Sequence, residues 1–255
     1  MPSRDLHIHA LSGLPLVQPG DNLATLLLEA LQRDQLQLRD GDVLVLAQKI
    51  VSKSEGRLVP LDTVSPSPRA LELAKATDKD PRLVELVLRE SNEVVRHRHN
   101  VMIVEHQTGF VMANAGIDMS NVQQEDGDTV LLLPADPDGS CAKLRRALKD
   151  LIGVNVGVII NDSHGRAWRN GTVGVAIGAA GLPALQDLRG QPDLFGRRLL
   201  ITEVGTADEI AAAASLLMGQ AAEGSPAVLV RGLSFVRQEG CAAELVRPRH
   251  MDMFR

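Results

Sequence analysis

The chain has 255 residues, 44% of them hydrophobic, and a formal net charge of -5 with a pI of about 5.8. This length and hydrophobic content predict a sizeable core, in one large domain or two small ones. The acidic charge and an aromatic content of 2% argue against a nucleic-acid binder that works by bulk charge or base stacking, so an anionic ligand would need a local basic cluster or metal ions.

The compartment is predicted from features that the sequence lacks. No apolar run reaches the roughly 18 residues of a membrane span, and the first residues carry no apolar segment typical of a secretory signal. Cys141 and Cys241 form no metal or redox spacing. We therefore expect a cytoplasmic protein with reduced cysteines.

The N-terminal part of the chain predicts helices around one buried strand. Residues 21–36 have helical apolar spacing, with Asp21 as a candidate N-cap. Residues 41–57 predict a turn, a buried strand and then a polar loop. Residues 65–92 predict two short helices, the second with Pro81 at its first position.

The rest of the chain mixes strands and helices. Helices are expected at 138–153, ending at a glycine, and at 206–220, beginning with a capping box of Thr206 and Glu209. Residues 172–185 are rich in glycine and alanine, which is typical of tight packing. Because strands and helices do not strictly alternate, the predicted fold class is mixed α/β (α+β). Strands are expected at 101–105, 109–116, 129–134, 156–160, 199–205 and 226–232.

Polar residues follow two of these apolar segments. The strand at 156–160 leads into "NDSHGRAWRNG" (161–171) instead of an ordinary turn. Asp118, in "NAGIDMSN", and Asp162 both lie in glycine-flanked turns, where carboxylates can converge on a hard cation. Ser163 would add a second oxygen next to a phosphate-bound cation. The alternative is that each aspartate caps a turn.

Cationic side chains lie near both stretches. Arg166 and Arg169 carry guanidinium groups that suit carboxylate and phosphate oxygens, or they pair with surface acids to little effect. Lys49 and Lys53, four residues apart after a buried strand, either reach phosphates or are solvated. Trp168, the only tryptophan, either stacks on a ligand ring or packs.

A third polar stretch is "MGQAAEGS" (218–225). Gly219 and Gly224 are separated like the glycines of a P-loop, but Ser225 stands where that motif requires lysine. The loop can still offer backbone N–H groups to phosphates, and Gln220 offers an amide oxygen to a metal. Alternatively, Gly219 only ends a helix.

The histidines raise a different possibility. His7 and His9 form the H-x-H pattern of amidohydrolase metal sites, and His97 and His99 repeat the spacing. Such sites need further ligands from the later strands of a barrel. The chain has no eight-fold βα pattern, so a metallohydrolase is the weaker hypothesis.

Together these stretches resemble the coenzyme F420-0:L-glutamate ligases, the F420 gamma-glutamyl ligase family. The resemblance runs from "GLPLV" near the start to "PAVLVRGL" near the end. Its motifs occur in the same order, which is more specific than any one of them. They are "QKIVSKSEGR", "ANAGIDMSNV", "NDSHGRAWRNG", "VGVAIGAAGL" and "ADEIAAAASLLMGQAAEG".

The resemblance implies an activity. Such an enzyme adds L-glutamate to coenzyme F420-0 and extends a gamma-linked oligoglutamate tail, using GTP through an acyl-phosphate intermediate. It implies two divalent cations per site, Mg²⁺ or Mn²⁺, with K⁺ as a possible addition. It also implies a family-specific α/β fold that forms an intertwined two-fold homodimer.

The resemblance also assigns site residues, to which we add two arginines as contacts for an anionic substrate. The catalytic set is Asp118, Asp162, Arg166 and Arg169. The metal ligands are Asp118, Asp162, Ser163 and Gln220. The GTP contacts are Leu14, Pro15, Leu16, Val17, Gln48, Lys49, Lys53, Asn121, Met218, Gly219, Gln220, Ala221, Ala222, Glu223, Gly224 and Ser225.

Two departures from the family pattern bear on the site. His164 stands where the family usually has an aromatic residue, and it is a candidate general base only by position and type. Gln48 and Lys49 replace a Ser-Thr pair of some relatives. A GTP-binding regulatory module that uses the same loops is the non-enzymatic alternative.

The domain boundaries follow from the same resemblance. Residues 1–247 are predicted to form the ligase domain, and residues 248–255 a C-terminal tail or linker remnant. Some bacterial ligases are fused to a flavin-dependent reductase, so the chain is either a stand-alone ligase or an excised domain.

Overall fold

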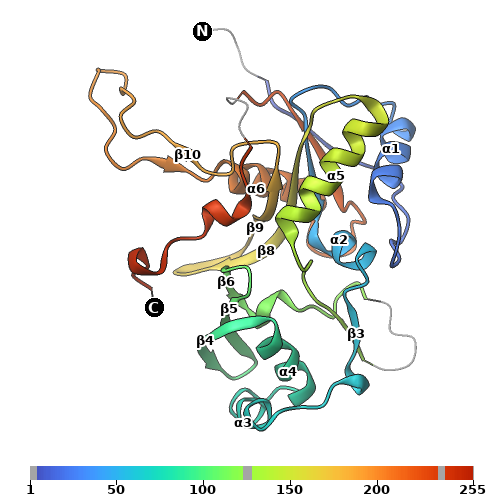
Figure 1. Cartoon of the computed structure of the whole chain (residues 1–255), viewed down its shortest axis with the longest axis vertical. Coiled ribbons are helices and arrows are strands. Elements are labelled where there is room, and N and C mark those ends of the chain that lie inside the picture. Colours follow the sequence, from blue (N-terminus) through green and yellow to red (C-terminus); the bar gives the residue numbers. More distant parts are fainter. Residues whose placement is uncertain (1–4, 123–127, 235–238, 255) are drawn as a thin grey trace.

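The computed structural model describes residues 5–122, 128–234 and 239–254. At its centre lies a five-stranded sheet with the order β1-β12-β2-β8-β9, in which β2 and β8 are parallel and the other neighbours antiparallel (Figure 1). The predicted mixed α/β class is confirmed. The strands are β1 (His7–Ala10), β2 (Val43–Ala47), β8 (Gly157–Arg166), β9 (Arg169–Ala180) and β12 (Ala227–Arg231).

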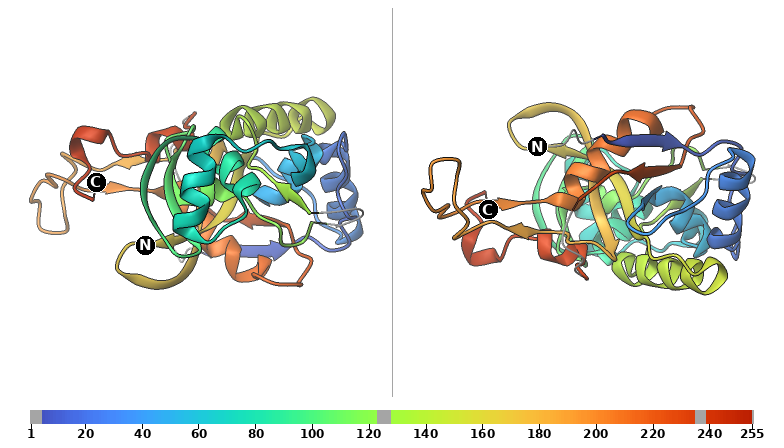
Figure 2. Two further views of the ribbon diagram at one scale, coloured as in Figure 1. Left: turned by 90° about the horizontal axis from the view of Figure 1, so that it is seen from below. Right: turned by 90° about the horizontal axis from the view of Figure 1, so that it is seen from above.

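Side chains of the central strand β2 alternate between two layers of helices. Leu44 and Leu46 pack against α1, α2 and α5, whereas Val43 and Val45 pack against α6. The ribbon views show α5 and α6 on opposite sides of the sheet (Figure 2). Burial of both faces explains why "VLVLA" is apolar at every position. Within the described ranges, no helix is both long and apolar enough to cross a bilayer. The helices are α1 (Leu23–Arg33), α2 (Gln48–Ser54), α5 (Pro137–Ile152) and α6 (Thr206–Met218).

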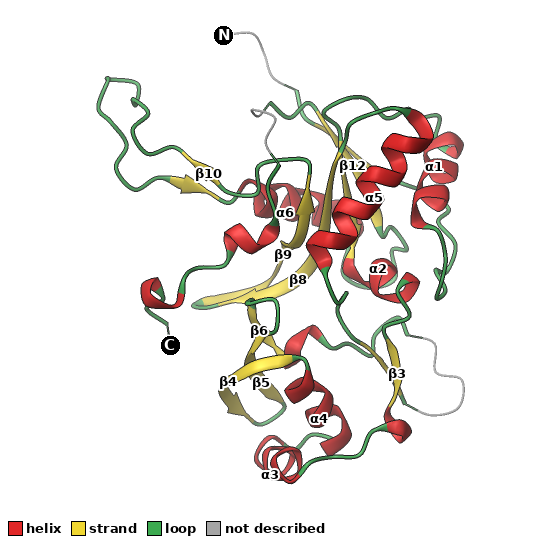
Figure 3. Cartoon of the chain, in the orientation of Figure 1, coloured by secondary structure: helices red, strands yellow, loops and turns green. Residues whose placement is uncertain are grey.

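A smaller lobe, residues 61–117, hangs from one end of the sheet (Figure 3). Its helices pack on a three-stranded antiparallel sheet through a separate core that includes Leu73, Val84 and Met102. The short β3–β7 pair lies where the chain enters and leaves this lobe. The elements of the lobe are η1 (Leu61–Thr63), α3 (Pro68–Thr77), α4 (Pro81–Arg89), β4 (Ser91–Arg98), β5 (Val101–His106), β6 (Val111–Ala113) and η2 (Asn114–Gly116). The flanking pair is β3 (Leu58–Pro60) and β7 (Thr129–Leu131).

Two segments project from the body (Figure 3). One is the outer part of the β8–β9 ribbon, which continues beyond the point where β2 stops pairing. The other, called the arm below, comprises residues 186–204, closed by β10 (Gln186–Asp187) and β11 (Glu203–Val204). The C-terminal residues form η3 (Ala242–Leu245) and η4 (Arg249–Met251).

The polar stretch at 161–171 is not the loop that the sequence predicted. The strand β8 continues through it to Arg166, and β9 begins at Arg169, so only a tight turn at Ala167 and Trp168 joins them. Trp168 has a φ of 65°. Hydrogen bonds to β9 maintain the outer part of β8, although its side chains are no longer apolar and buried. A prediction based on buried apolar residues therefore misses this part of the strand.

The polar run after β2 is also not a loop. It forms α2, because Ile50 and Val51 pack into the core while Lys49 and Lys53 lie four residues apart on the outer side. The 199–205 strand was wrong in extent, since only the two residues of β11 pair. The two helices of the smaller lobe are confirmed, with Pro81 in the first turn of α4, and β5 pairs with β6 as expected. The predicted 109–116 strand is too long, since only Val111–Ala113 pair and Asn114–Gly116 form η2.

Two predicted N-caps are wrong by one residue. The N-cap of α1 is Asn22, and Asp21 instead accepts a hydrogen bond from the Gln18 N–H at 2.7 Å. The N-cap of α6 is Gly205, which makes Thr206 the first helical residue and excludes the capping box. The Thr206 hydroxyl is buried and has no hydrogen-bond partner among the residues that the structure describes.

Candidate active site

Three predicted site segments meet at one edge of the central sheet. Because β2 and β8 are parallel, their carboxyl ends lie side by side, with Ala47 paired to Asn161. The Ala47 N–H donates to the Pro226 carbonyl at 2.8 Å, which brings in the start of β12. Helix α2, Asp162 and the 218–225 loop therefore lie together at the carboxyl ends of these strands. The carboxyl ends of parallel strands are common ligand sites in α/β proteins.

Both lysines of helix α2 bind the segment around Asp118. The Lys49 ammonium lies 2.8 Å from Asp118 Oδ2 and donates to the Ser120 carbonyl at 3.2 Å and hydroxyl at 2.5 Å. The Lys53 ammonium donates to the Asn121 carbonyl at 2.7 Å. Of the two sequence alternatives for these lysines, the one in which they are merely solvated is wrong.

The electrostatics of this contact favour charged groups. Burial opposes ionisation of Asp118, but hydrogen bonds from Lys49 and Ser120 outweigh it and hold the pKa of Asp118 below its ordinary value. Burial lowers the pKa of Lys53, and the like charge of Lys49 lowers it further. Positive charge is thus concentrated beside a half-buried carboxylate.

Asn121 connects this segment to the 218–225 loop. It adopts a left-handed conformation with a φ of 56°, and its amide nitrogen donates to the Ala221 carbonyl at 3.3 Å. Gly219 ends α6, as one sequence alternative proposed, with a φ of 70°. The Glu223 carboxylate accepts the Ala221 N–H at 2.8 Å, and such backbone N–H groups lower the pKa of Glu223. The Glu223 carboxylate therefore occupies a loop N–H group that could otherwise bind a phosphate.

Asp162 and Ser163 point to opposite faces of β8. Asn161 donates to Ser215 Oγ at 2.9 Å and so faces α6. Since strand side chains alternate, Ser163 shares that side, and Asp162 shares the other side with His164. The His164 Nε2 atom lies 3.0 Å from Asp162 Oδ2. The two neighbouring oxygens thus serve different sides of the strand.

The arginines lie farther out on the ribbon. Arg166 and Arg169 pair across its turn, about 13 Å along the strand from Asp162 at roughly 3.3 Å per residue. Neither makes an ion pair with another described residue, so the surface-pair alternative receives no support. Trp168 is 88% exposed and contacts Phe254, with ring centroids 6.3 Å apart.

The remaining predicted nucleotide contacts border α2. The 14–17 segment leads to Gly20, whose N–H donates to the Ser54 carbonyl at 2.8 Å at the end of that helix. Leu16 is exposed, whereas Val17 is buried in the core. Gln48 is buried as well, and its side-chain oxygen accepts a hydrogen bond from the Ser52 hydroxyl at 2.9 Å.

The described residues give no support to a hydrolase metal centre at His7 and His9. Their rings stack with centroids 6.3 Å apart on β1, an edge strand that pairs antiparallel with β12. No group of three or more His, Cys, Asp and Glu residues suited to a metal occurs in the described part of the chain.

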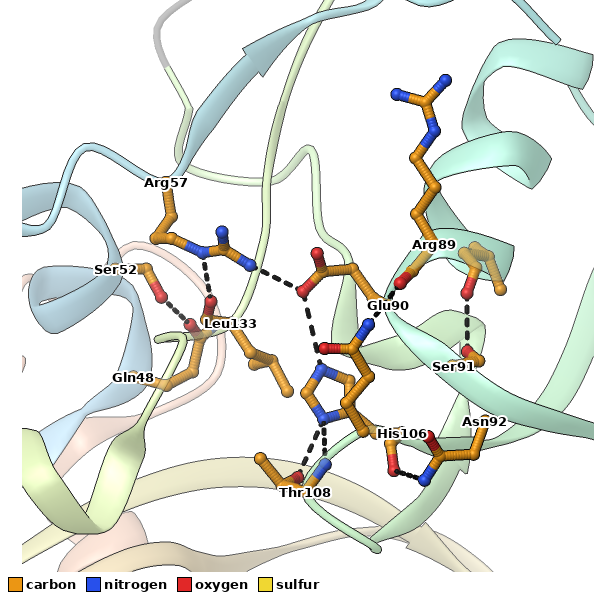
Figure 4. A network of polar contacts seen from close by, with 12 residues as sticks. Gln48, Ser52, Arg57, Arg89, Glu90, Ser91, Asn92, His106, Thr108 and Leu133 are labelled. Atoms are coloured by element: carbon orange, nitrogen blue, oxygen red, sulfur yellow. Dashed lines mark hydrogen bonds and ion pairs between the residues drawn. The ribbon is translucent and has the colours of Figure 1, made fainter.

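A buried polar junction next to the site was not predicted (Figure 4). Arg57, just beyond α2, lies 2.6 Å from Glu90 Oε2 and donates to the Leu133 carbonyl at 2.8 Å. His106 Nδ1 accepts the Thr108 N–H at 3.1 Å, and its Nε2 lies 3.7 Å from the same Glu90 oxygen. The junction holds the smaller lobe (residues 61–117) against the body. Asp118 directly follows this lobe.

Ser120 is the other functional residue missing from the predicted set. A signal for it existed, since an aspartate side chain in a turn commonly accepts the backbone N–H two residues further on. Its N–H donates to Asp118 Oδ1 at 2.7 Å and its hydroxyl to Oδ2 at 3.0 Å. The turn just before Asp118 is unusual, because Asn114, Ala115 and Gly116 all have positive φ values.

Comparisons with known proteins agree on one family. The family model described as F420-0:Gamma-glutamyl ligase matches residues 13–232. The chain is 49% identical over 245 residues to the coenzyme F420:L-glutamate ligase of Methanothermobacter thermautotrophicus, covering 95% of this chain and 96% of that protein. The Methanopyrus kandleri protein of that name is 50% identical over 243 residues, covering 94% and 93%. The Archaeoglobus fulgidus one is 44% identical over 250 residues, covering 98% and 96%.

Proposed function

The chain belongs to the F420-0:gamma-glutamyl ligase family, and we propose that it adds L-glutamate to coenzyme F420-0 at the sheet edge described above. Family membership supports glutamate ligation in F420 biosynthesis as the reaction. Within that reaction we further propose that GTP supplies the energy, that an acyl phosphate is the intermediate, and that the enzyme extends the gamma-linked tail.

One observation carries this proposal. The segments that the family resemblance assigns to nucleotide, namely α2, Asn121 and the 218–225 loop, are joined by direct hydrogen bonds although they lie far apart in sequence. The candidate metal ligands Asp118 and Asp162 belong to the same edge. Such an arrangement suits transfer of a phosphoryl group between two anionic ligands.

The donor set fits a hard divalent cation. Asp118, Asp162, Ser163 and Gln220 offer only oxygen atoms, which Mg²⁺ and Mn²⁺ prefer to nitrogen or sulfur. The opposite orientation of Asp162 and Ser163 on β8 supports two ions over one. When bound, such ions neutralise charge on phosphate oxygens. K⁺ remains a prediction from the family resemblance.

The proposed reaction has two steps. A carboxylate oxygen of the acceptor attacks the γ-phosphorus of GTP, and GDP leaves with the electron pair of the broken P–O bond. The glutamate amine then attacks the acyl carbon, inorganic phosphate leaves, and the amine loses a proton. Lys49 and Lys53 supply fixed positive charge near the phosphates. We propose that Arg166 or Arg169 holds an anionic substrate group, and that His164 is the candidate base beside Asp162.

The arm supports the proposal of a homodimer. Leu194, Phe195, Leu200 and Ile201 are each at least 73% exposed on a segment that projects from the body. An exposed apolar surface of this kind is typical of an interface. We propose that a second copy covers it, in the intertwined arrangement that the family resemblance implies.

The 1–247 and 248–255 domain boundaries stay predictions. They include residues 1–4, 123–127, 235–238 and 255, which lie outside the described residues.

A ligation assay tests the function. The protein is incubated with F420-0, L-glutamate, GTP and Mn²⁺, and GDP release and product mass are followed. We expect sustained GDP release, over many turnovers, only when glutamate and acceptor are both present, with mass gains of one or more glutamate units. GDP release without either substrate would favour the regulatory alternative, and the absence of any glutamylated product would refute the proposal.

A further inference from the structure

We propose that the Lys49 ammonium competes with the divalent cation for the Asp118 carboxylate and transfers to a nucleotide phosphate when the cation binds. The inference rests on the proposed function, because it assumes that Asp118 is a metal ligand. It assigns Lys49 a role in metal affinity beyond that of a phosphate contact.

The contacts of Asp118 show why a cation must displace Lys49. Both carboxylate oxygens already have partners: Oδ1 accepts the Ser120 N–H, and Oδ2 accepts the Ser120 hydroxyl and faces the Lys49 ammonium at 2.8 Å. A divalent cation on Oδ2 would lie within a few ångström of that ammonium. Two positive charges at such a distance repel strongly, so the two occupants exclude each other.

Lys49 is able to move. Its side chain is 25% exposed, and its other contacts are to the oxygens of a single residue, Ser120. A lysine has a flexible four-carbon stem and three rotatable donors, so it can exchange one anion for another. The neighbouring 218–225 loop, joined to the Asp118 segment through Asn121, is where the phosphates are proposed to lie.

Lys53 offers a matched comparison within the same helix. It carries the same charge one helical turn away, and it holds the same segment. Its ammonium, however, donates to the Asn121 carbonyl and not to the carboxylate. Removing Lys53 therefore removes charge and a contact to the backbone without freeing Asp118.

The consequence is a positive coupling between cation and nucleotide. In the free enzyme the cation must displace Lys49, whereas in the nucleotide complex the ammonium already has a phosphate partner. Each ligand therefore strengthens binding of the other, and by linkage the factor is the same in both directions. Without Lys49, the cation binds more tightly to the free enzyme and depends less on nucleotide.

The test measures Mn²⁺ binding directly, by electron paramagnetic resonance of free Mn²⁺, in the full-length protein with and without GDP. For Lys49→Gln we expect Mn²⁺ affinity without GDP to rise about fivefold, the upper end for a partly exposed ion pair, and the GDP effect to shrink by a similar factor. For Lys53→Gln we expect Mn²⁺ affinity without GDP to change less than about twofold. Lys49→Arg, which keeps the charge, should resemble the wild type.

Unchanged or weaker Mn²⁺ binding in Lys49→Gln would overturn the inference, as would an equal gain in Lys53→Gln. Lys49→Met removes the same charge and keeps the apolar stem, so it answers the question if the Gln variant does not fold. The ligation assay separates the two claims. A wild type that glutamylates F420-0 while Lys49→Gln shows no gain refutes only the role of Lys49, whereas a wild type that makes no product refutes the proposed function.

Discussion

Two ion pairs join the α2 region to the smaller lobe and to the segment that follows it. They differ in whether a ligand can separate the two charged groups. Lys49–Asp118 and Arg57–Glu90 have similar lengths, 2.8 and 2.6 Å. The two cations are almost equally exposed, at 25% and 24%, but the Glu90 side chain is 16% exposed against 38% for Asp118, and it lies beside His106, which is 2% exposed. The first contact can therefore open to ligands, while the second cannot open without leaving buried charge uncompensated. Length alone does not distinguish a functional contact from a structural one.

The largest expected effect is on activity. Asp162→Asn should lower the glutamylation rate by at least about 100-fold, because the amide cannot supply the charge that the proposed metal requires. The melting temperature should change little, since His164, on the same face of β8, is the only partner of the Asp162 carboxylate among the described residues. The control is Asp150→Asn on the exposed side of α5. Full activity of the Asp162 variant would remove this residue from the site.

The second effect is on stability. Glu90→Ala should destabilise the protein by about 3 kcal/mol, because it leaves the Arg57 guanidinium half-buried without its carboxylate. The matched control is Glu72→Ala. Glu72 forms an ion pair of the same length, 2.6 Å, with Arg69 on the surface of α3, and its removal should cost less than about 1 kcal/mol. Urea unfolding measures both values, and equal losses would abolish the distinction between the two kinds of ion pair.

The junction should also be sensitive to pH. Burial opposes ionisation of Glu90, but His106 and Arg57 outweigh it and lower the pKa of Glu90 below its ordinary value of 4.5. A lowered carboxylate pKa contributes stability that is present above the unfolded value and is lost as pH falls through the folded one. The stability difference between the wild type and Glu90→Gln should therefore shrink as the solution is acidified below about pH 5.5. A difference that grows on acidification would have the wrong sign.

A smaller effect is expected on the anion side of the site. Glu223 lies on the Ala221 N–H that a phosphate could use. Glu223→Gln should raise GDP affinity by about threefold, because a neutral amide accepts the N–H more weakly and does not repel phosphate. Isothermal titration calorimetry checks this, with Glu209→Gln on α6 as a control of equal charge change. Weaker GDP binding in the Glu223 variant would mean that this carboxylate supports the bound state.

The sequence predicted the core elements better than the site. Buried strands such as β2 and β12 and the glycine ends of α5 and α6 follow from local patterns, and the structure confirms them. The outer half of β8 does not, because pairing with β9 sustains it in place of apolar burial. The Arg57–Glu90 pair joins residues 33 positions apart, and no local pattern connects them. Family motifs proposed Asp118 and Asp162 as site residues, but the contact of Lys49 with Asp118 could be seen only in the folded chain.

The smallest expected effect concerns the exposed end of the ribbon, where neither buried charge nor a proposed metal is at stake. Trp168→Ala should change the unfolding free energy by less than about 0.5 kcal/mol, because the indole is largely solvated and its one ring contact within the described residues is with Phe254. As the only tryptophan, it also reports on ligands: its fluorescence should change when F420-0 binds if the ribbon borders the acceptor, as the positions of Arg166 and Arg169 propose. Phe254→Ala serves as the control, since it removes the ring contact without touching the ribbon. An unchanged signal on acceptor binding would place the acceptor away from the turn and leave both arginines without a role in holding it.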